Sequence, residues 1–351
     1  MPAVRRPPGL GLLPVGRLRD GVHSQRHYSA IQAPRHCWRG PPGLEFSRER
    51  QVAGARPMRP FAHFAPGSLD EAVEIFRREG EGGRPLAGGT DLVVQLKEGG
   101  HKFPYPRYLV SLRRLPELRA LEWRDGQGLL LGAGLTMAEV ARAEAVRGRY
   151  SALADGAGLV GSLQTMNMAT VGGNVCNAAP SADTAPPLLA LEASARIVGP
   201  EGERLVPLEE FWLGPGQTAL RHGEVLVEFL LPPPMPRSAS IYRRHTPRQQ
   251  MDIAVVGVAV AVALDEAGRT LRKVRIALGA VAPTPMRARR AEAALEGQAP
   301  TDEAIARAAA LAREEARPIS DLRGSAAFRR HLVGVMTERL LREAIERARR
   351  S

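Results

Sequence analysis

The stretch that decides the fold is ATVGGNVCNAAPSAD, residues 169–183. Its one reactive side chain is Cys176, and its other residues are small or carry hydrogen-bonding groups. Glycines such as Gly172 and Gly173 have no Cβ, so they can take positive φ angles and let backbone N–H groups approach a ligand closely. This composition is typical of a segment that binds a ligand with its backbone.

A second stretch of the same kind, AGGTDL, occupies residues 87–92. Gly88 and Gly89 offer the same backbone freedom, Thr90 adds a hydroxyl donor, and the predicted helix that follows favours an anion at its first amides. Either Gly-Gly pair alone is also what a tight turn requires. Two such loops from distant parts of the chain together predict a site that holds a pyrophosphate between them.

Helix and strand patterns alternate around both loops. Ser68 and Glu71 form a capping-box pattern, and apolar residues at helical spacing predict a helix from residue 69 to Gly80. A second capping box, Thr136 with Glu139, begins another helix. Short helices and strands are predicted at 83–86, 91–97, 108–112, 128–132, 195–199, 203–211 and 224–232. The prolines that follow, between residues 232 and 236, mark a linker.

The last third of the chain has a different pattern. Strands are predicted at 238–245, 252–264 and 271–281, the last two joined as a hairpin by residues 265–270. Two helices follow, one capped by Thr301 and one that begins after Ser325. The second is predicted to bury the face formed by Phe328, Leu332, Val335, Met336 and Leu340. The sequence therefore predicts three folded parts, 58–112, 113–231 and a sheet-and-helix module over 238–351.

Residues 1–57 lack any periodic apolar pattern and contain several prolines. We expect a disordered or mis-annotated extension, with Met58 as a possible start; a genuine transit or docking arm is the alternative. This segment holds ten Arg and three acids, so it carries most of the formal net charge of +12. The folded part has no concentrated basic stripe, and we expect no nucleic-acid binding.

The remaining composition excludes several classes of protein. With only Cys37 and Cys176, the chain cannot build a disulfide framework or a cysteine metal cluster, and Cys176 is interpreted as a small packed residue. The small number of cysteines fits a reducing cytoplasm, where we expect this protein. The longest apolar run, residues 253–264, is too short to cross a bilayer, so we expect no membrane span. Common hydrolase, metalloprotease and nucleotide-binding motifs are absent, and Met137 stands where a dinucleotide-binding motif has its third glycine.

The residues around the two loops resemble a known family. LAGGTDLVVQLKEG (86–99) and GSLQTMNMATVGGNVCNAAPSADTAPPLLALEA (161–193) are similar to the FAD-binding subunit of the molybdenum hydroxylases, which include carbon monoxide, xanthine and nicotinate dehydrogenases. The resemblance continues through YRRHTPRQQMDIAVVGVAV (242–260) and ISDLRGSAAFRRHLVGVMTERLLREAI (319–345), so it covers the chain from residue 58 onward. It implies an α+β class: a two-subdomain FAD-binding fold of the vanillyl-alcohol-oxidase type, followed by a C-terminal sheet-and-helix module.

The resemblance also implies how the cofactor is held. Residues 87–92 and 170–174 would hold the pyrophosphate from two sides, Ser181 and Asp183 the ribityl or adenosine end, and Arg243 negative charge on the reduced flavin. Val160, Gly161 and Leu226 would approach the isoalloxazine. The implied FAD-binding residues are Leu86, Ala87, Gly88, Gly89, Thr90, Asp91, Leu92, Val160, Gly161, Ala169, Thr170, Gly172, Gly173, Asn174, Ser181, Asp183, Leu226 and Arg243. Met166 departs from the family, which commonly has Arg there.

The function implied is electron transfer with FAD as the only cofactor, and with no catalytic side chain or metal of the chain's own. Electrons would arrive from an iron–sulfur small subunit, which serves a molybdopterin large subunit, and would leave to a final acceptor. One alternative is a stand-alone FAD-dependent oxidoreductase, which would need its own substrate pocket and a proton donor near the flavin. Another is a non-enzymatic scaffold with vestigial loops. The sequence leaves the substrate and the acceptor open.

Overall fold

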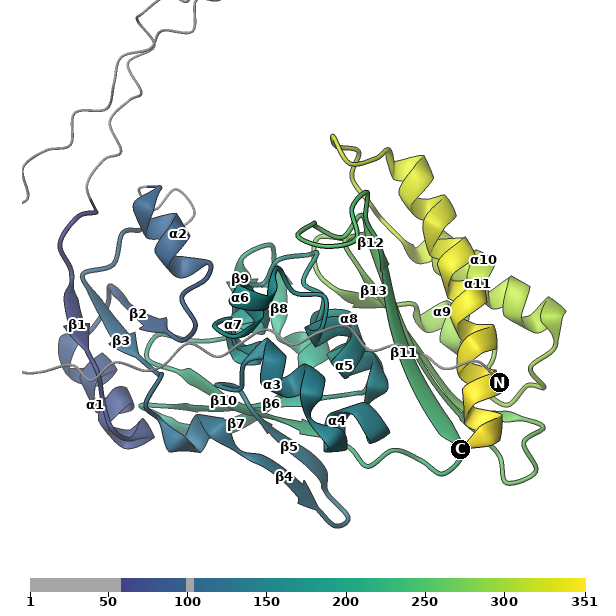
Figure 1. The fold of residues 1–351 in the computed structure, drawn as a ribbon, viewed down its shortest axis with the longest axis horizontal. Coiled ribbons are helices and arrows are strands. Elements are labelled where there is room, and N and C mark those ends of the chain that lie inside the picture. Colours follow the sequence, from purple (N-terminus) through teal and green to yellow (C-terminus); the bar gives the residue numbers. More distant parts are fainter. Residues whose placement is uncertain (1–57, 99–103) are drawn as a thin grey trace, which may run out of the picture. The chain divides into compact units, whose positions relative to one another are not determined.

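The computed structural model describes residues 58–98 and 104–351 (Figure 1). The predicted extension, residues 1–57, lies outside the described residues. Within the described ranges, no helix is both long and apolar enough to cross a membrane. The described chain forms three larger sheets and the helices packed on them, in agreement with the predicted α+β class.

The first sheet is small and parallel. Its strands are β1 (Ala62–Phe64), β2 (Gly83–Leu86) and β3 (Tyr108–Ser111), with β3 in the centre. Helix α1 (Leu69–Glu79) begins as predicted, because the Ser68 hydroxyl accepts a hydrogen bond from the Glu71 amide, and α2 (Leu92–Lys97) follows β2. Since all three strands run the same way, their carboxyl ends share one edge, where open α/β sheets bind ligands.

The second sheet is antiparallel, in the order β4 (Leu121–Arg124), β5 (Gly128–Gly132), β10 (Val225–Leu231), β6 (Ser194–Gly199) and β7 (Gly202–Pro207). Between β5 and β6 the chain forms six short helices: α3 (Met137–Arg142), α4 (Glu144–Arg149), α5 (Ser151–Ala157), α6 (Leu163–Met166), α7 (Val171–Cys176) and α8 (Ala185–Ala190). The predicted capping box of Thr136 and Glu139 is present at the start of α3. The remaining short elements are η1 (Pro116–Arg119), η2 (Leu208–Glu210), β8 (Trp212–Gly214) and β9 (Gln217–Thr218).

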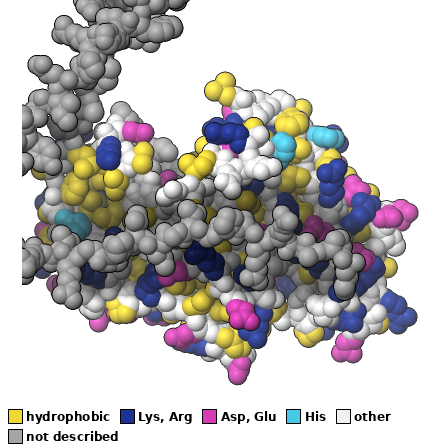
Figure 2. Space-filling view, in the orientation of Figure 1, with side chains coloured by type: hydrophobic (Ala, Val, Ile, Leu, Met, Phe, Trp, Pro, Cys, Tyr) yellow, Lys and Arg dark blue, Asp and Glu magenta, His cyan; other side chains and the backbone are white. Residues whose placement is uncertain are grey.

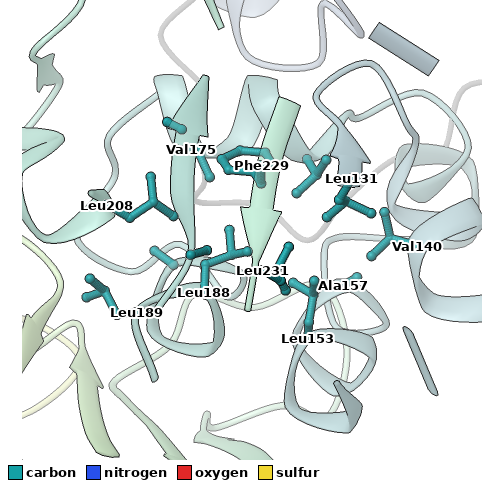
Figure 3. Packing of buried hydrophobic residues seen from close by; sticks show 14 of the residues in the cluster. Leu131, Val140, Leu153, Ala157, Val175, Leu188, Leu189, Leu208, Phe229 and Leu231 are labelled. Carbon is teal, nitrogen blue, oxygen red and sulfur yellow. The ribbon is translucent and has the colours of Figure 1, made fainter. Parts of the chain in front are cut away.

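The main hydrophobic core lies between this sheet and its helices. Figure 3 shows Leu131 and Phe229 of the sheet among side chains from the helices, including Val140, Leu153 and Val175. These residues are almost fully buried. Helix α7 lies within the glycine-rich segment 169–183 and is packed into this core through Val171 and Val175. The core therefore holds this segment in position.

The third sheet belongs to the C-terminal module. Its antiparallel strands are β11 (Ser238–His245), β12 (Val256–Leu264), β13 (Leu271–Gly279) and β14 (Met286–Arg287), in chain order. The predicted hairpin joins β12 to β13. After α9 (Arg289–Ala293), helices α10 (Asp302–Glu315) and α11 (Ala326–Arg350) pack against each other, and α11 lies on β11 and β12 (Figure 1).

Two predictions about this module were wrong in detail. Helix α11 does not bury Phe328, which is 42% exposed, and buries the neighbouring Arg329 instead. The Arg329 guanidinium donates to the carbonyls of Val255 and Ala280, so the helix is rotated by about one residue from the predicted face. Strand β12 begins at Val256 rather than at residue 252, because the Asp252 carboxylate accepts from backbone amides at 248 and 253 and holds that stretch in a turn.

Candidate functional site

A hollow of about 510 Å³ lies at the carboxyl edge of the parallel sheet. Its walls include Leu86 at the end of β2, the stretch 87–89 that follows it, Ser111 at the end of β3, and Met168. Figure 2 shows hydrophobic side chains gathered over α2, whose Val93 also lines the hollow. The volume falls in the range of small-molecule and cofactor sites. A second cavity, beside the proline linker, has about 70 Å³ and would hold only a few water molecules.

The first predicted loop presents unused backbone donors beside this hollow. The amides of Gly88, Gly89, Thr90 and Asp91 donate no hydrogen bond to any other described residue, whereas the Val93 amide donates to the Gly89 carbonyl and begins α2. Gly89 has φ +74°, a conformation that suits glycine. Consecutive free amides after a strand are a common way to bind an anion.

The second predicted loop is not a loop. Residues 171–176 form α7, and the Thr170 hydroxyl caps it by accepting from the Gly173 amide at 3.0 Å. The amides of Val171 and Gly172 donate to the carbonyls of Leu135 and Ala133, and the Asn174 amide also bonds within the segment, to Thr170. Its backbone donors are therefore largely engaged inside the protein.

Gly172 is needed for packing rather than for a positive φ. A Cβ at this position would lie 2.6 Å from the Cβ of Ala133, so only glycine lets α7 sit this close to the residues after β5. Of the four glycines in the two predicted loops, Gly89 alone has a positive φ. The expectation that all four supply left-handed backbone was wrong, because Gly88 and Gly172 instead allow close approach of backbone, and a Cβ on Gly173 would meet only the Thr170 hydroxyl.

The two glycine-rich segments nevertheless meet. A Cβ on Gly88 would lie 2.0 Å from the Met168 carbonyl oxygen, so the stretch 87–92 contacts the backbone that leads into α7. At the far end of that helix, the Asn174 side-chain oxygen accepts a hydrogen bond from the Thr184 hydroxyl at 2.6 Å. Gly88 therefore lies against the backbone that leads into α7, and the end of α7 is bonded to Thr184, the residue after Asp183.

Asp183, the residue before Thr184, is a buried acidic group. Its carboxylate accepts a hydrogen bond from the Tyr242 hydroxyl at 2.8 Å and pairs with Arg244. Burial raises the pKa of Asp183 to about 6, against the lowering effects of Arg244 and Tyr242. Since this pKa is above the usual value of 3.8, the contribution of this carboxyl to stability is complete below about pH 4 and is lost as the pH rises through about 6.

Arg244 is a candidate functional residue that sequence analysis did not single out. Its side chain is 4% exposed, and its Nε and Nη2 atoms are buried with no hydrogen-bond partner among the described residues. A buried guanidinium with two unused donors destabilises the fold unless a ligand accepts hydrogen bonds from them. Strand alternation was the available signal, because Tyr242 and Arg244 lie two residues apart and therefore share a face of β11.

The side chain of Arg243, which was predicted to lie near the flavin, forms ion pairs with two carboxylates instead. Its guanidinium pairs with Asp155 at 3.0 Å and Glu343 at 3.5 Å, and the side chain is 46% exposed. Strand alternation explains this, since Arg243 faces away from Arg244 and Asp183.

The other residues predicted to contact FAD differ in how deeply they are buried. Leu226 is 4% exposed within the main core, while Val160 and Ser181 are half-buried. Gly161 has φ +61° in the turn before α6, and Met166 packs partly against the core. Leu226 is thus the predicted flavin contact that the core encloses most fully.

Two further residues of the hollow were not singled out from sequence. Arg113 and Arg114 lie two and three residues after the end of the central strand β3 and line the same hollow as Gly88 and Gly89. Their position after a parallel strand was the signal that could have found them.

Comparison with known protein families gives two matches. Residues 59–234 match the FAD binding domain in molybdopterin dehydrogenase, and residues 240–344 match the CO dehydrogenase flavoprotein C-terminal domain. The chain is 34% identical to the carbon monoxide dehydrogenase medium chain of Hydrogenophaga pseudoflava over 81% of this chain and 96% of that one. It is 33% identical to a putative xanthine dehydrogenase FAD-binding subunit of Escherichia coli, over 75% and 89% of the two chains.

Solved structures show the same architecture. Carbon monoxide dehydrogenase from Hydrogenophaga pseudoflava, in a form that lacks the Mo-pyranopterin moiety of the molybdenum cofactor, superposes with a TM-score of 0.77 at 35% identity, covering 82% of this chain and 98% of that one. Quinoline 2-oxidoreductase from Pseudomonas putida superposes with a TM-score of 0.75 at 30% identity, covering 83% and 99%. The predicted fold, an FAD-binding domain followed by a C-terminal module, is confirmed by these matches.

Proposed function

Because the chain belongs to the FAD-binding subunits of the molybdenum hydroxylases, we propose that it is the electron-transfer flavoprotein of such a complex. It receives electrons from an iron–sulfur small subunit, which is reduced in turn by a molybdopterin large subunit. It passes them to a final acceptor outside the complex.

One observation carries this proposal: the unused backbone amides of residues 88–91 beside a hollow large enough for a cofactor. The FAD diphosphate supplies the anionic oxygens that these donors lack. The two unused donors of the buried Arg244 could bind carbonyl or hydroxyl oxygens of the same cofactor. The free amides and the buried guanidinium are therefore the groups whose chemistry fits FAD.

The chain's own residues bind and orient the cofactor, and they set the charge around it. Bound flavin supplies the redox chemistry, because it can accept electrons singly and release them as a pair. Arg244 would bring a positive charge that favours added negative charge on a nearby flavin, and the Asp183 carboxylate, which also accepts a hydrogen bond from the Tyr242 hydroxyl, holds its guanidinium in place.

The electron donor must be another subunit. Iron–sulfur clusters in proteins are generally held by four cysteines or by a mixture of cysteine and histidine, and this sequence has two cysteines in total. One of these, Cys176, is a thiol whose pKa is raised to about 12 by burial. A thiol that stays protonated is a poor metal ligand.

The test is to isolate the tagged chain from its native host and determine what accompanies it. The proposal predicts one FAD per chain, with iron and molybdenum in the same particle on two further polypeptides. After the partners are removed under mild conditions, the yellow chain should keep its FAD but contain no iron or molybdenum. Purification of a lone flavoprotein that oxidises its own organic substrate at full rate would replace this function with a stand-alone oxidoreductase.

A further inference from the structure

We infer that Arg113 and Arg114 are the counter-charges of the cofactor's diphosphate, a role that rests on the proposed function and extends it. The two guanidinium groups would neutralise the two negative charges of the diphosphate while the amides of residues 88–91 orient its oxygens. Neither arginine lies in the two glycine-rich segments that suggested the site.

The topology places both arginines at the ligand edge. Strand β3 is central in the parallel sheet, and its last residue, Ser111, pairs with Leu86 at the end of β2. The Leu112 amide donates to the Leu86 carbonyl at 2.9 Å, so the chain after β3 leaves beside the start of the first glycine-rich segment. Arg113 and Arg114 come next, and both line the hollow together with Gly88 and Gly89.

The charge balance of the hollow favours an anion. No Asp or Glu is among the described residues that line it. Arg113 and Arg114 make no ion pair or hydrogen bond with any described residue, although most arginines in the neighbouring sheet, such as Arg196 and Arg204, are paired with carboxylates. Two uncompensated cations in a hollow without carboxylates create a positive potential that attracts a doubly charged group.

The backbone amides of α7 already have hydrogen-bond partners, so positive side chains are needed to bind the diphosphate. The sequence suggests that residues 170–174 hold the diphosphate from the second side, but the amides of Val171 to Asn174 already have partners inside the segment or on the backbone of residues 133–135. Backbone donors on that side are therefore few. The arginines after β3 supply the missing attraction, and guanidinium suits phosphate oxygens because it can donate two parallel hydrogen bonds.

The alternative is that both arginines are ordinary solvated surface residues. That alternative predicts no effect on ligands, since both side chains are exposed and have no internal bonds to lose. The same property makes substitution safe, because replacing them removes no contact from the fold.

The experiment compares the full-length apo-protein with its Arg113→Gln/Arg114→Gln variant. A matched control, Arg272→Gln/Arg307→Gln, removes the same charge from exposed, unpaired arginines of β13 and α10 in the C-terminal module. Each protein is titrated with FAD, with ADP and with adenosine, which lacks the diphosphate. Urea unfolding of each apo-protein is measured alongside.

We expect the Arg113→Gln/Arg114→Gln variant to bind FAD and ADP about a hundredfold more weakly, roughly tenfold for each charged hydrogen bond lost. Adenosine binding and unfolding should not change, and increasing salt should weaken FAD binding less in the variant than in the wild type. Arg113→Lys/Arg114→Lys should recover part of the affinity, because the charges return without the guanidinium geometry.

Two results would overturn the inference. Equal FAD and ADP affinities in the glutamine variant and the wild type would mean that the arginines are solvated surface groups. An equal loss for ADP and adenosine, with lowered stability, would mean a structural role. Failure of wild-type apo-protein to bind FAD at all is a different outcome, because it would refute the proposed function itself and this inference with it.

Discussion

Gly172→Ala should destabilise the fold without removing the cofactor-binding groups. The added methyl group would lie 2.6 Å from the Ala133 Cβ and 2.8 Å from the Ala133 carbonyl oxygen. Ordinary carbon–carbon contacts are about 3.5–4.0 Å, so α7 must move by roughly 1 Å away from the residues after β5. Overpacking of this kind costs about 1–3 kcal/mol, and replacing a helical glycine returns up to about 1 kcal/mol. The expected net loss is about 1–2 kcal/mol in the free energy of unfolding.

Gly173→Ala is the matched control on the same helix. Its added Cβ would approach only the Thr170 hydroxyl, at 2.9 Å. Disturbing that helix cap costs about 1 kcal/mol, and the gain from replacing a helical glycine is similar, so the net change should be small. Urea unfolding of the two apo-proteins gives the free energies, and absorbance after gel filtration gives FAD per folded chain.

The outcome separates two roles for the glycine pair. We expect Gly172→Ala to be the less stable variant and to retain close to one FAD per folded chain. If Gly172→Ala unfolds like the wild type but purifies colourless, then Gly172 serves the cofactor directly, and the packing argument is wrong.

Three further predictions concern single side chains. Arg244→Gln should lose FAD from the folded chain while Arg243→Gln keeps it, as measured by flavin content after dialysis; equal retention would refute the role of Arg244. Because burial raises the pKa of Asp183, wild-type apo-protein should lose about 1.4 kcal/mol of stability relative to Asp183→Asn between about pH 5 and about pH 8, measured by urea unfolding. A difference of opposite sign would contradict the raised pKa. Cys176 should resist iodoacetamide in the folded protein, as mapped by mass spectrometry, because its pKa is about 12; rapid alkylation would show an accessible thiolate.

The fold could be predicted in large part because its signals are local. Helix α1 begins at a Ser68 cap that the sequence displays directly, and the capping box at Thr136 likewise marks the start of α3. The β12–β13 hairpin was also visible, as two apolar runs separated by a short polar turn. In each case the determining contacts lie within a few residues, where spacing alone carries the information.

The errors arose where distant contacts decide the conformation. The face of α11 depends on Arg329, whose partners Val255 and Ala280 lie on other elements, so helical periodicity pointed instead to the apolar Phe328. Similarly, GG at 172–173 suggests a loop, but the close approach of Ala133 makes it the first turn of a packed helix. Sequence shows that glycine is present and does not show which neighbour requires it.

The candidate site could be predicted only in part, because some of its features also depend on contacts between distant residues. Residues 87–92 were predicted from a Gly-Gly turn after a strand, which is a local feature, and the amides of residues 88–91 are unused among the described residues; that they bind the cofactor stays a prediction. The sequence pointed to Arg243, whereas the residue of β11 that turns toward Asp183 is Arg244, and only this pairing reveals which face of the strand is turned inward. The contribution of Arg113 depends on the order of the strands in the sheet, which local pattern does not specify.

The most direct test of the central claim is electron transfer into the bound flavin from the iron–sulfur partner. The separated iron–sulfur subunit is reduced chemically, freed of reductant, and mixed without oxygen with the oxidised flavoprotein, while the visible flavin absorbance is followed. The account predicts rapid bleaching, at a rate compatible with turnover of the complete complex, and no bleaching by organic substrates in the absence of partners. A flavin that stays oxidised with the reduced partner, yet bleaches when the isolated chain meets an organic substrate, would contradict it.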